Sequence, residues 1–197
     1  MGRWGFRLFE CDTDMDILLN LPEAVGIDEK EWRFTLGQLV HQSDMLAPAE
    51  STAWYQTPEY AVVLEEEMVP YIRNKLDTDG LGEQLIERSR HNGQFWDPDY
   101  QTILLGAIMM RAGANIKPEH LLYLRRAARR IGIESVQAQF LAALDHYQPG
   151  VPRSFQDDCC ISCGENESDL GYPLQKCETC KVFYCDRKCK RRHELEH

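Results

Sequence analysis

The sequence lacks any apolar run that approaches the ~18 residues of a membrane-spanning helix. It also lacks the long apolar segment of a secretory signal peptide, because its N-terminus reads Met1-Gly-Arg-Trp-Gly-Phe-Arg. These absences predict a soluble protein with no membrane partner. We expect it to be intracellular, cytoplasmic or nuclear, where cysteines stay reduced.

Motifs of the common catalytic sites are missing as well. The chain has no glycine-rich phosphate loop, no Gly-x-Ser-x-Gly turn and no His-Glu-x2-His helix. The histidines before the C-terminal segment stand apart from one another, at His41, His91, His120 and His146. We therefore predict that the protein is not an enzyme and has no catalytic residues. The alternative is an enzyme whose active site, in the N-terminal part, carries no recognisable motif.

Basic residues are in the minority, since 22 Lys and Arg stand against 32 Asp and Glu and give a formal net charge of -10. Residues 159–197 contain seven of each sign, so the whole excess of acidic residues lies in the chain before them. An acidic surface repels phosphate backbones. The charge distribution therefore disfavours a nucleic-acid partner.

Cysteine is rare before residue 159, where Cys11 stands alone, and frequent after it. Two residues between cysteines allow one turn to point both sulfurs at an ion, and three residues place both ligands on one face of a helix. Residues 160–197 contain four such pairs, Cys160-x2-Cys163, Cys177-x2-Cys180, Cys185-x3-Cys189 and His193-x3-His197. Nitrogen and sulfur ligands in two sets of four predict two bound Zn2+ ions. Cys159 is an alternative to Cys160 as a ligand, but Cys160-x2-Cys163 is the commoner spacing, so Cys159 is expected to be a spare thiol.

The four pairs can be combined in two ways. In a sequential arrangement, the first two pairs bind one zinc and the last two bind the other, but the last two lie within thirteen residues of one helical stretch. Ligands at helical spacing cannot surround an ion, so we favour the interleaved arrangement, a cross-brace. It assigns Cys160, Cys163, Cys185 and Cys189 to one zinc, and Cys177, Cys180, His193 and His197 to the other.

The spacing of these pairs, together with the Phe183-Tyr184-Cys185 sequence, resembles the MYND and HIT families of double-zinc cross-brace fingers. The resemblance covers about a fifth of the chain. The Cys-x3-Cys-x3-His ending is similar to HIT, with His197 where that family usually has Cys, and the longer Cys163 to Cys177 gap is more like MYND. The resemblance implies a structural finger that contacts a protein or peptide partner.

One departure from the MYND pattern bears on the partner. The Gln and Trp with which MYND domains grip proline-containing peptides correspond to Lys190 and Glu194 here. A nucleic-acid-binding finger is a further alternative, because Cys177-x2-Cys180-x12-His193-x3-His197 also fits the spacing of a two-Cys two-His finger. Against it, that intervening segment contains Cys185 and Cys189, which this kind of finger does not need.

Apolar spacing and cap residues predict helices at the start of the chain. We expect a helix from Asp12 or Thr13 that Pro22 ends. The preceding Trp4-Gly5-x3-Phe9 is similar to the start of an uncharacterised family. A second helix is expected over about 29–43, with a strand at 32–36 as the alternative, and a loop over 44–56.

Proline marks further helix boundaries. Thr57-Pro58 begins a helix that Pro70 ends or kinks, and Asp79-Gly80 breaks the one or two short helices that follow. Three helices are then expected as an antiparallel stack, from Asp97-Pro98 to about Arg111, from Lys117-Pro118 to Ile131 and from Glu134 to Tyr147.

The expected organisation follows from these patterns. The fold class is mainly α, with an acidic helical domain of unknown function over 1–147, a proline-broken linker over 148–158 and a small zinc finger over 159–197. A finger of this size has too few apolar residues for a core of its own and needs a metal to fold. We predict a zinc-binding protein whose finger mediates a protein-protein interaction.

Overall fold

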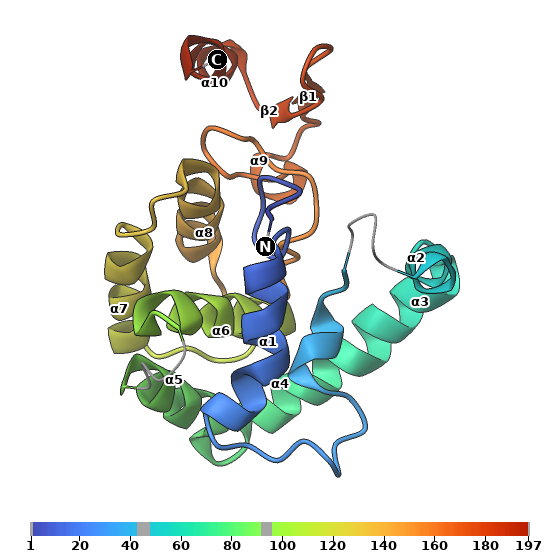
Figure 1. Cartoon of the computed structure of the whole chain (residues 1–197), viewed down its shortest axis with the longest axis vertical. Helices are drawn as coiled ribbons and strands as arrows, with labels where there is room; N and C mark the ends of the chain where they lie inside the picture. The colour runs from blue at the N-terminus through green and yellow to red at the C-terminus, as the bar shows by residue number, and fades with distance from the viewer. Residues whose placement is uncertain (1, 43–47, 92–95, 197) are drawn as a thin grey trace.

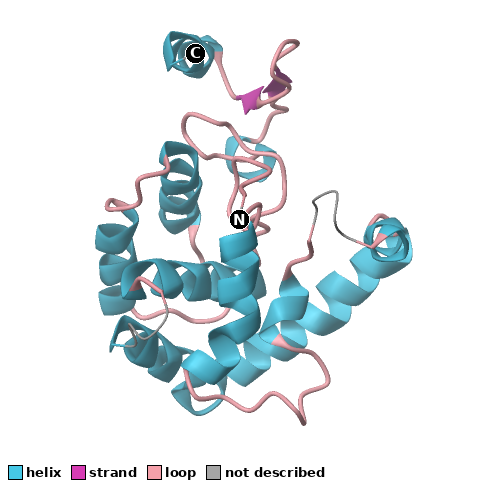
Figure 2. Cartoon of the chain, in the orientation of Figure 1, coloured by secondary structure: helices cyan, strands magenta, loops and turns pink. Residues whose placement is uncertain are grey.

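A computed structural model describes residues 2–42, 48–91 and 96–196. The chain is mainly helical, as the sequence predicts, and the strands of the described part lie in the C-terminal module (Figure 2). The helical body contains α1 (Asp12–Ala24), η1 (Leu36–Leu39), α2 (Ala49–Tyr55), α3 (Pro58–Val62), η2 (Val63–Met68), α4 (Val69–Asp77), η3 (Thr78–Gly80), α5 (Leu81–His91), α6 (Pro98–Ala112), α7 (Pro118–Ala128) and α8 (Glu134–His146). The module, residues 159–197, contains α9 (Glu167–Leu170), the antiparallel strands β1 (Gln175–Lys176) and β2 (Phe183–Tyr184), and α10 (Arg187–Glu196).

Helix α6 lies at the centre of the body, and α1, α4, α5 and α7 pack around it (Figure 1). Every residue from Gln101 to Ala112 is buried. The helix begins where the Asp97 side chain accepts a hydrogen bond from the Tyr100 backbone N–H at 2.9 Å. It ends at Gly113, whose φ of 68° closes the last turn. Both ends are where the sequence predicts them.

Helix α7 ends earlier than expected. It stops at Ala128, three residues before the predicted end at Ile131. The Gln137 side chain donates hydrogen bonds to the carbonyls of Ala128 and Ile131, at 3.0 and 3.2 Å. These bonds satisfy carbonyls that a longer helix would otherwise pair, so α7 can end there.

Helix α1 runs past the proline that was expected to end it. Pro22 lies inside α1, which continues to Ala24. A proline near the end of a helix removes a single hydrogen bond. Continuing the helix brings Val25, its C-cap residue, into the core, which offsets that loss.

The helix predicted over 29–43 is wrong, and so is the alternative strand. Only the single turn η1, Leu36–Leu39, is helical within the described part of this stretch. It begins with a capping box, in which Thr35 and Gln38 bond each other's backbone N–H groups. Leu36 and Leu39 are buried as the spacing indicates, but an irregular backbone brings them there.

Two further predictions in this part of the chain need correction. The stretch 44–56 was expected to be a loop, but Ala49–Tyr55 forms α2, while 44–47 lie outside the described residues. Pro70 does not end its helix, because helical backbone continues from the π-helix η2 into α4, whose first turn contains Pro70; the alternative, that Pro70 kinks the helix, stays a prediction. A π-helical turn changes the hydrogen-bond pattern directly before Pro70, so the missing N–H can be accommodated there. The helix start at Thr57-Pro58 and the break at Asp79, whose φ is 54°, are as predicted.

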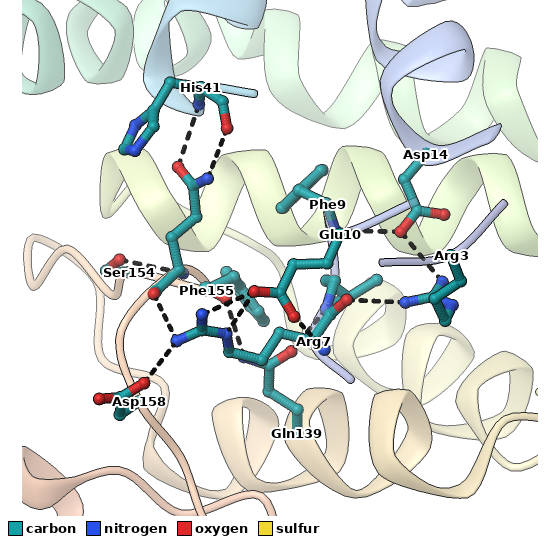
Figure 3. Close-up of polar contacts among 12 residues, drawn as sticks. Arg3, Arg7, Phe9, Glu10, Asp14, His41, Gln139, Ser154, Phe155 and Asp158 are labelled. Atoms are coloured by element: carbon teal, nitrogen blue, oxygen red, sulfur yellow. Dashed lines mark hydrogen bonds and ion pairs between the residues drawn. The ribbon is translucent and has the colours of Figure 1, made fainter. Parts of the chain in front are cut away.

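The segment 148–158 has no helix or strand, yet it packs against the body. The Phe155 side chain is fully buried, and its ring stacks on Phe140 with the centroids 6.2 Å apart. The Gln139 side chain donates to the Phe155 carbonyl at 2.9 Å and accepts from the Leu8 N–H at 2.8 Å (Figure 3). The packing of the segment 148–158 is therefore continuous with that of the body. No helix of the described residues is long and apolar enough to span a membrane.

Candidate metal centre

The first pair of predicted ligands lies in a tight turn, here called the first knuckle (residues 160–165). The Cys160 N–H donates to the Glu165 carbonyl at 2.8 Å, and the Gly164 N–H donates back to the Cys160 carbonyl at 2.8 Å. Gly164 has a φ of 79°. This left-handed residue reverses the chain directly after Cys163, so that both sulfurs lie on the same side of the turn.

The second pair lies in a turn of the same construction, the second knuckle (residues 177–182). The Cys177 N–H donates to the Val182 carbonyl at 2.7 Å, and the Lys181 N–H donates to the Cys177 carbonyl at 3.0 Å. Lys181 has a φ of 65° and takes the place that Gly164 has in the first knuckle. Each knuckle therefore presents two sulfurs from one closed turn.

Backbone N–H groups point at the first sulfur of each knuckle. The pKa of the Cys160 thiol is lowered to about 5, foremost by a hydrogen bond from the Cys163 thiol and further by backbone N–H donors that include Ser162. The pKa of Cys177 is lowered by the N–H groups of Cys180 and Thr179. Donors aimed at sulfur favour the thiolate, which is the form that binds a metal.

The third pair flanks the beginning of α10. Cys185 directly follows β2, and Cys189 lies in the first turn of α10, where its N–H donates to the Asp186 side chain at 2.7 Å. This cap fixes the direction in which the helix leaves the strand. Strand β2 is tied to the first knuckle, because the Ile161 N–H donates to the Phe183 carbonyl at 2.9 Å.

These elements bring four thiols together, here called the four-cysteine group. Its members are Cys160, Cys163, Cys185 and Cys189, and their sulfurs all lie within 4.8 Å of one another. Four sulfurs at 2.3 Å from a tetrahedral zinc would be about 3.8 Å apart. The Cys163 and Cys185 sulfurs are 3.6 Å apart, which agrees with that spacing and is too long for a disulfide.

The surroundings of the four-cysteine group favour a cation. Cys160 is fully buried, and Cys185 and Cys189 are 7% exposed. Burial, with the neighbouring Cys185 thiol, raises the pKa of Cys189 to about 12, so the four thiols do not ionise together by themselves. A divalent ion compensates the charge of the thiolates, and a set of four sulfurs without oxygen ligands fits zinc. The group can hold one metal ion.

The predicted second set is only partly assembled in the described residues. The Cys180 sulfur lies 3.1 Å from His193 Nε2, and His193 is 7% exposed. Cys177 shares its knuckle with Cys180, while His197 lies outside the described residues. Across the described ranges, the four-cysteine group is the only set of three or more ligand side chains this close together. It combines the pairs as the interleaved arrangement does.

The remaining cysteines lie outside the four-cysteine group. Cys159 directly precedes it, and burial raises the pKa of its thiol to about 12. Cys11 ends the N-terminal opening, residues 2–11, where it forms an isolated bridge with Arg3. Neither Cys159 nor Cys11 forms a disulfide bond.

Sequence reasoning missed the residues that join the segment 148–158 to the body on one side and to the module on the other. The Arg7 side chain donates to the Gln156 carbonyl at 2.7 Å and to Asp158 at 2.9 Å (Figure 3). Arg153 forms a double hydrogen bond with Asp169, and both side chains are largely buried. Partners 151 residues apart, such as Arg7 and Asp158, leave no periodic signal in a sequence. The one signal of this junction in the sequence was Gly164, a glycine directly after a Cys-x2-Cys pair.

The chain matches no protein-family model, no curated protein and no solved structure. The candidate function therefore depends on the geometry of the four-cysteine group and its surroundings.

Proposed function

We propose that the module is a structural zinc finger of the MYND/HIT-like cross-brace kind. The observation that carries this proposal is the four-cysteine group, four sulfurs within 4.8 Å of one another, three of them on buried cysteines, that come from a knuckle and from the start of a helix. One Zn2+ binds there. A second Zn2+ binds Cys177, Cys180, His193 and His197, which the matching second knuckle and the contact between Cys180 and His193 support.

Metal analysis of the full chain, purified without chelator, tests this proposal. We expect close to two zinc ions per chain, because each knuckle supplies half of a four-ligand set. A value near one would mean that the second set is not assembled. A value near zero under reducing conditions would reject the zinc finger.

The zinc ions of this proposal are structural and not catalytic. A catalytic zinc keeps a coordination position for water or substrate, whereas the four-cysteine group supplies four protein ligands. We therefore infer that the protein is not an enzyme and that the module serves to present a surface. The helical body has no proposed activity.

The partner we propose is an acidic peptide segment with apolar side chains, belonging to another protein. Tyr172 is 47% exposed on the module. Several basic side chains of α10 are also exposed, namely Arg187, Lys188, Arg191 and Arg192. Tyr184, in contrast, is buried against the cysteines and shields the sulfurs. The exposed set combines an aromatic ring with positive charge, which suits such a peptide.

Affinity capture with the full chain tests the partner. The variant Tyr172→Ser with Lys188→Glu and Arg191→Glu changes the exposed surface and leaves every zinc ligand in place. We expect partners captured by the wild type to be lost with this variant, while the zinc content stays the same. Partners retained by the variant would contradict the proposed surface.

The basic face of α10 also allows a second candidate, a nucleic-acid interface. Binding through these side chains would weaken steeply with salt, because each neutralised phosphate releases counterions. We expect no measurable affinity of the full chain for duplex DNA or RNA at physiological salt, since the formal net charge is -10. Submicromolar, strongly salt-dependent binding in an anisotropy assay would replace the protein-interaction proposal.

A further inference from the structure

Gly164 belongs to the first knuckle and also faces the body. It is buried, and its N–H closes the turn by donating to the Cys160 carbonyl at 2.8 Å. A Cβ atom at this position would lie 2.2 Å from the carbonyl carbon and oxygen of Ala138 and 2.3 Å from the nitrogen of Gln139. These are backbone atoms of α8, which cannot move aside as a flexible side chain does. The first knuckle therefore lies directly on the backbone of α8.

The second knuckle shows why residue 164 is a glycine. Lys181 occupies the equivalent position with a φ of 65° and the same hydrogen bond to the first cysteine. The turn itself therefore admits a side chain. What excludes a side chain at Gly164 is the close approach to α8, so this glycine is a requirement of docking.

Gln139 connects this contact to the rest of the body. It directly follows Ala138, and its side chain accepts from the Leu8 N–H and donates to the Phe155 carbonyl (Figure 3). The N-terminal opening and the segment 148–158 thus meet at the place where the first knuckle rests on α8. Both of these hydrogen bonds are buried.

A second contact supports the same junction. The Asp169 side chain is 5% exposed and pairs with Arg153, whose side chain is 12% exposed. Asp169 also accepts a hydrogen bond from the Asn166 N–H at 3.0 Å, which caps α9 just after the first knuckle. If the knuckle moved away from α8, Arg153 would lose this partner in a largely buried place. Such a loss is costly, because a buried charge is left without its counter-charge.

We infer that metal binding at the four-cysteine group holds the first knuckle against α8, a coupling here called the latch. Metal occupancy then stabilises α8 and the N-terminal opening. This inference rests on the zinc proposed above. Cys160 and Cys163 hold the metal, and Gly164, the next residue, makes the contact with α8. The conformation that binds the metal is also the conformation that docks. Removing the metal leaves four crowded thiols, three of them on buried cysteines, which opens the turn and releases the contact.

Hydrogen exchange of the full chain, with zinc and after chelation under reducing conditions, tests the latch. Chelation should lower the protection of amides in α8 and in residues 8–11 by about tenfold or more, since local opening is then easier. Amides of α5, on the far side of α6 from the module (Figure 1), should change by less than about twofold. Unchanged protection in α8 after the metal is removed would overturn the inference.

A pair of matched variants makes the test specific. Gly164→Ala and Gly171→Ala both put a Cβ on a left-handed residue of the module, at φ values of 79° and 71°. Only the first would collide with α8, because Gly171 has nothing within 4 Å of its Cβ position. We expect Gly164→Ala to bind zinc but to show no zinc-dependent protection of α8, and Gly171→Ala to behave like the wild type.

The outcomes separate the latch from the zinc proposal. Equal zinc-dependent protection in both variants would overturn the latch. If Gly164→Ala loses zinc, the hydrogen-exchange measurement on the wild type alone decides whether zinc protects α8. A wild-type chain that binds no zinc contradicts the proposed function, whereas a chain that binds zinc without protecting α8 contradicts only the latch.

Discussion

The helical body and the C-terminal module are held together by different forces. In the body, α6 is buried along its length from Gln101 to Ala112, and apolar side chains from many helices surround it. In the module, the buried cluster consists of Cys160, Tyr184, Cys185 and Cys189. Three of these four residues are candidate metal ligands. The body can therefore fold by burying apolar surface, whereas the module has little apolar core of its own and, under the zinc proposal, depends on a bound metal.

This difference determines what each region tolerates. Apolar burial is shared among many side chains, so one substitution removes only a part of it. A metal site with four ligands loses its function when one ligand is lost. The following predictions test this contrast, from the largest expected effect to the smallest.

Cys160→Ser should have the largest effect and should be confined mainly to the module. Structural zinc contributes about 10–16 kcal/mol of apparent binding free energy in small fingers. We expect the variant to lose one zinc per chain and the fold of the module, while the far-UV helical signal of the body persists. Metal analysis combined with circular dichroism measures both. Cys159→Ser is the control, since Cys159 lies next to Cys160 but outside the four-cysteine group, and it should keep its zinc.

Phe140→Ala tests the body in the same way. Phe140 is fully buried and packs on Phe155, so its truncation should lower the free energy of unfolding by about 3–5 kcal/mol. Zinc content should not change. Denaturant unfolding gives the stability, and Leu122→Ala, at a side chain that is 51% exposed, is the matched control. A loss of zinc in Phe140→Ala would show that the two regions are less separate than their cores indicate.

Acid should distinguish the two regions by pH. In the body, the pKa of Asp99 is lowered from its usual value of 3.8. Burial alone would raise this pKa, but the hydrogen bonds from Tyr123 and Arg130 outweigh the effect of burial. A lowered pKa contributes stability above the usual pKa, and this stability is lost as pH falls through the folded-state pKa. Asp99→Asn should therefore be less stable than the wild type at neutral pH, and the difference should shrink as pH falls below 3.8.

The module should respond to acid at higher pH, because protons compete with zinc for the thiolates. Zinc release from the module is followed with a chromogenic chelator, and the unfolding of the wild type and of Asp99→Asn is measured over the same pH range. Asp16→Asn, on the exposed face of α1, serves as the control for the Asp99 variant. A gap between Asp99→Asn and the wild type that is constant down to pH 2 would contradict the role of this carboxylate.

The smallest predicted effect concerns one helix cap of the body. The Thr57 hydroxyl accepts from the Tyr60 N–H at 3.1 Å at the start of α3. Thr57→Ala should cost about 1 kcal/mol of stability, and Thr57→Ser, which keeps the hydroxyl, should cost much less. Chemical denaturation resolves such a difference. Equal losses in both variants would show that the methyl group, and not the cap, carries the effect.

The sequence was most informative where one residue type determines the local structure. Asp97-Pro98 and Gly113 marked both ends of α6, and the Cys-x2-Cys spacing indicated the two knuckles. Caps and tight turns are decided within a few residues, so the sequence alone is enough to identify them.

Sequence reasoning was wrong where tertiary contacts outweighed local preference. The residues around Trp32 have helical spacing but lie on an irregular backbone, which the Glu29 side chain holds by accepting from the Leu36 N–H at 2.8 Å. Pro22 was expected to end α1, but buried side chains on both sides of it keep the helix intact. The docking of Gly164 on α8 depends on the positions of two distant segments, and no spacing in the sequence records them.

The buried bond between the Leu8 N–H and Gln139 Oε1 has a consequence for the order in which the chain folds during synthesis. The two residues are 131 positions apart. At roughly 5–20 residues per second, Gln139 leaves the ribosome on the order of ten seconds after Leu8. During that interval α1 and the helices after it can assemble, whereas the Leu8 N–H still lacks the Gln139 side chain as its acceptor. This contact of the N-terminal opening is therefore among the last contacts of the body to form.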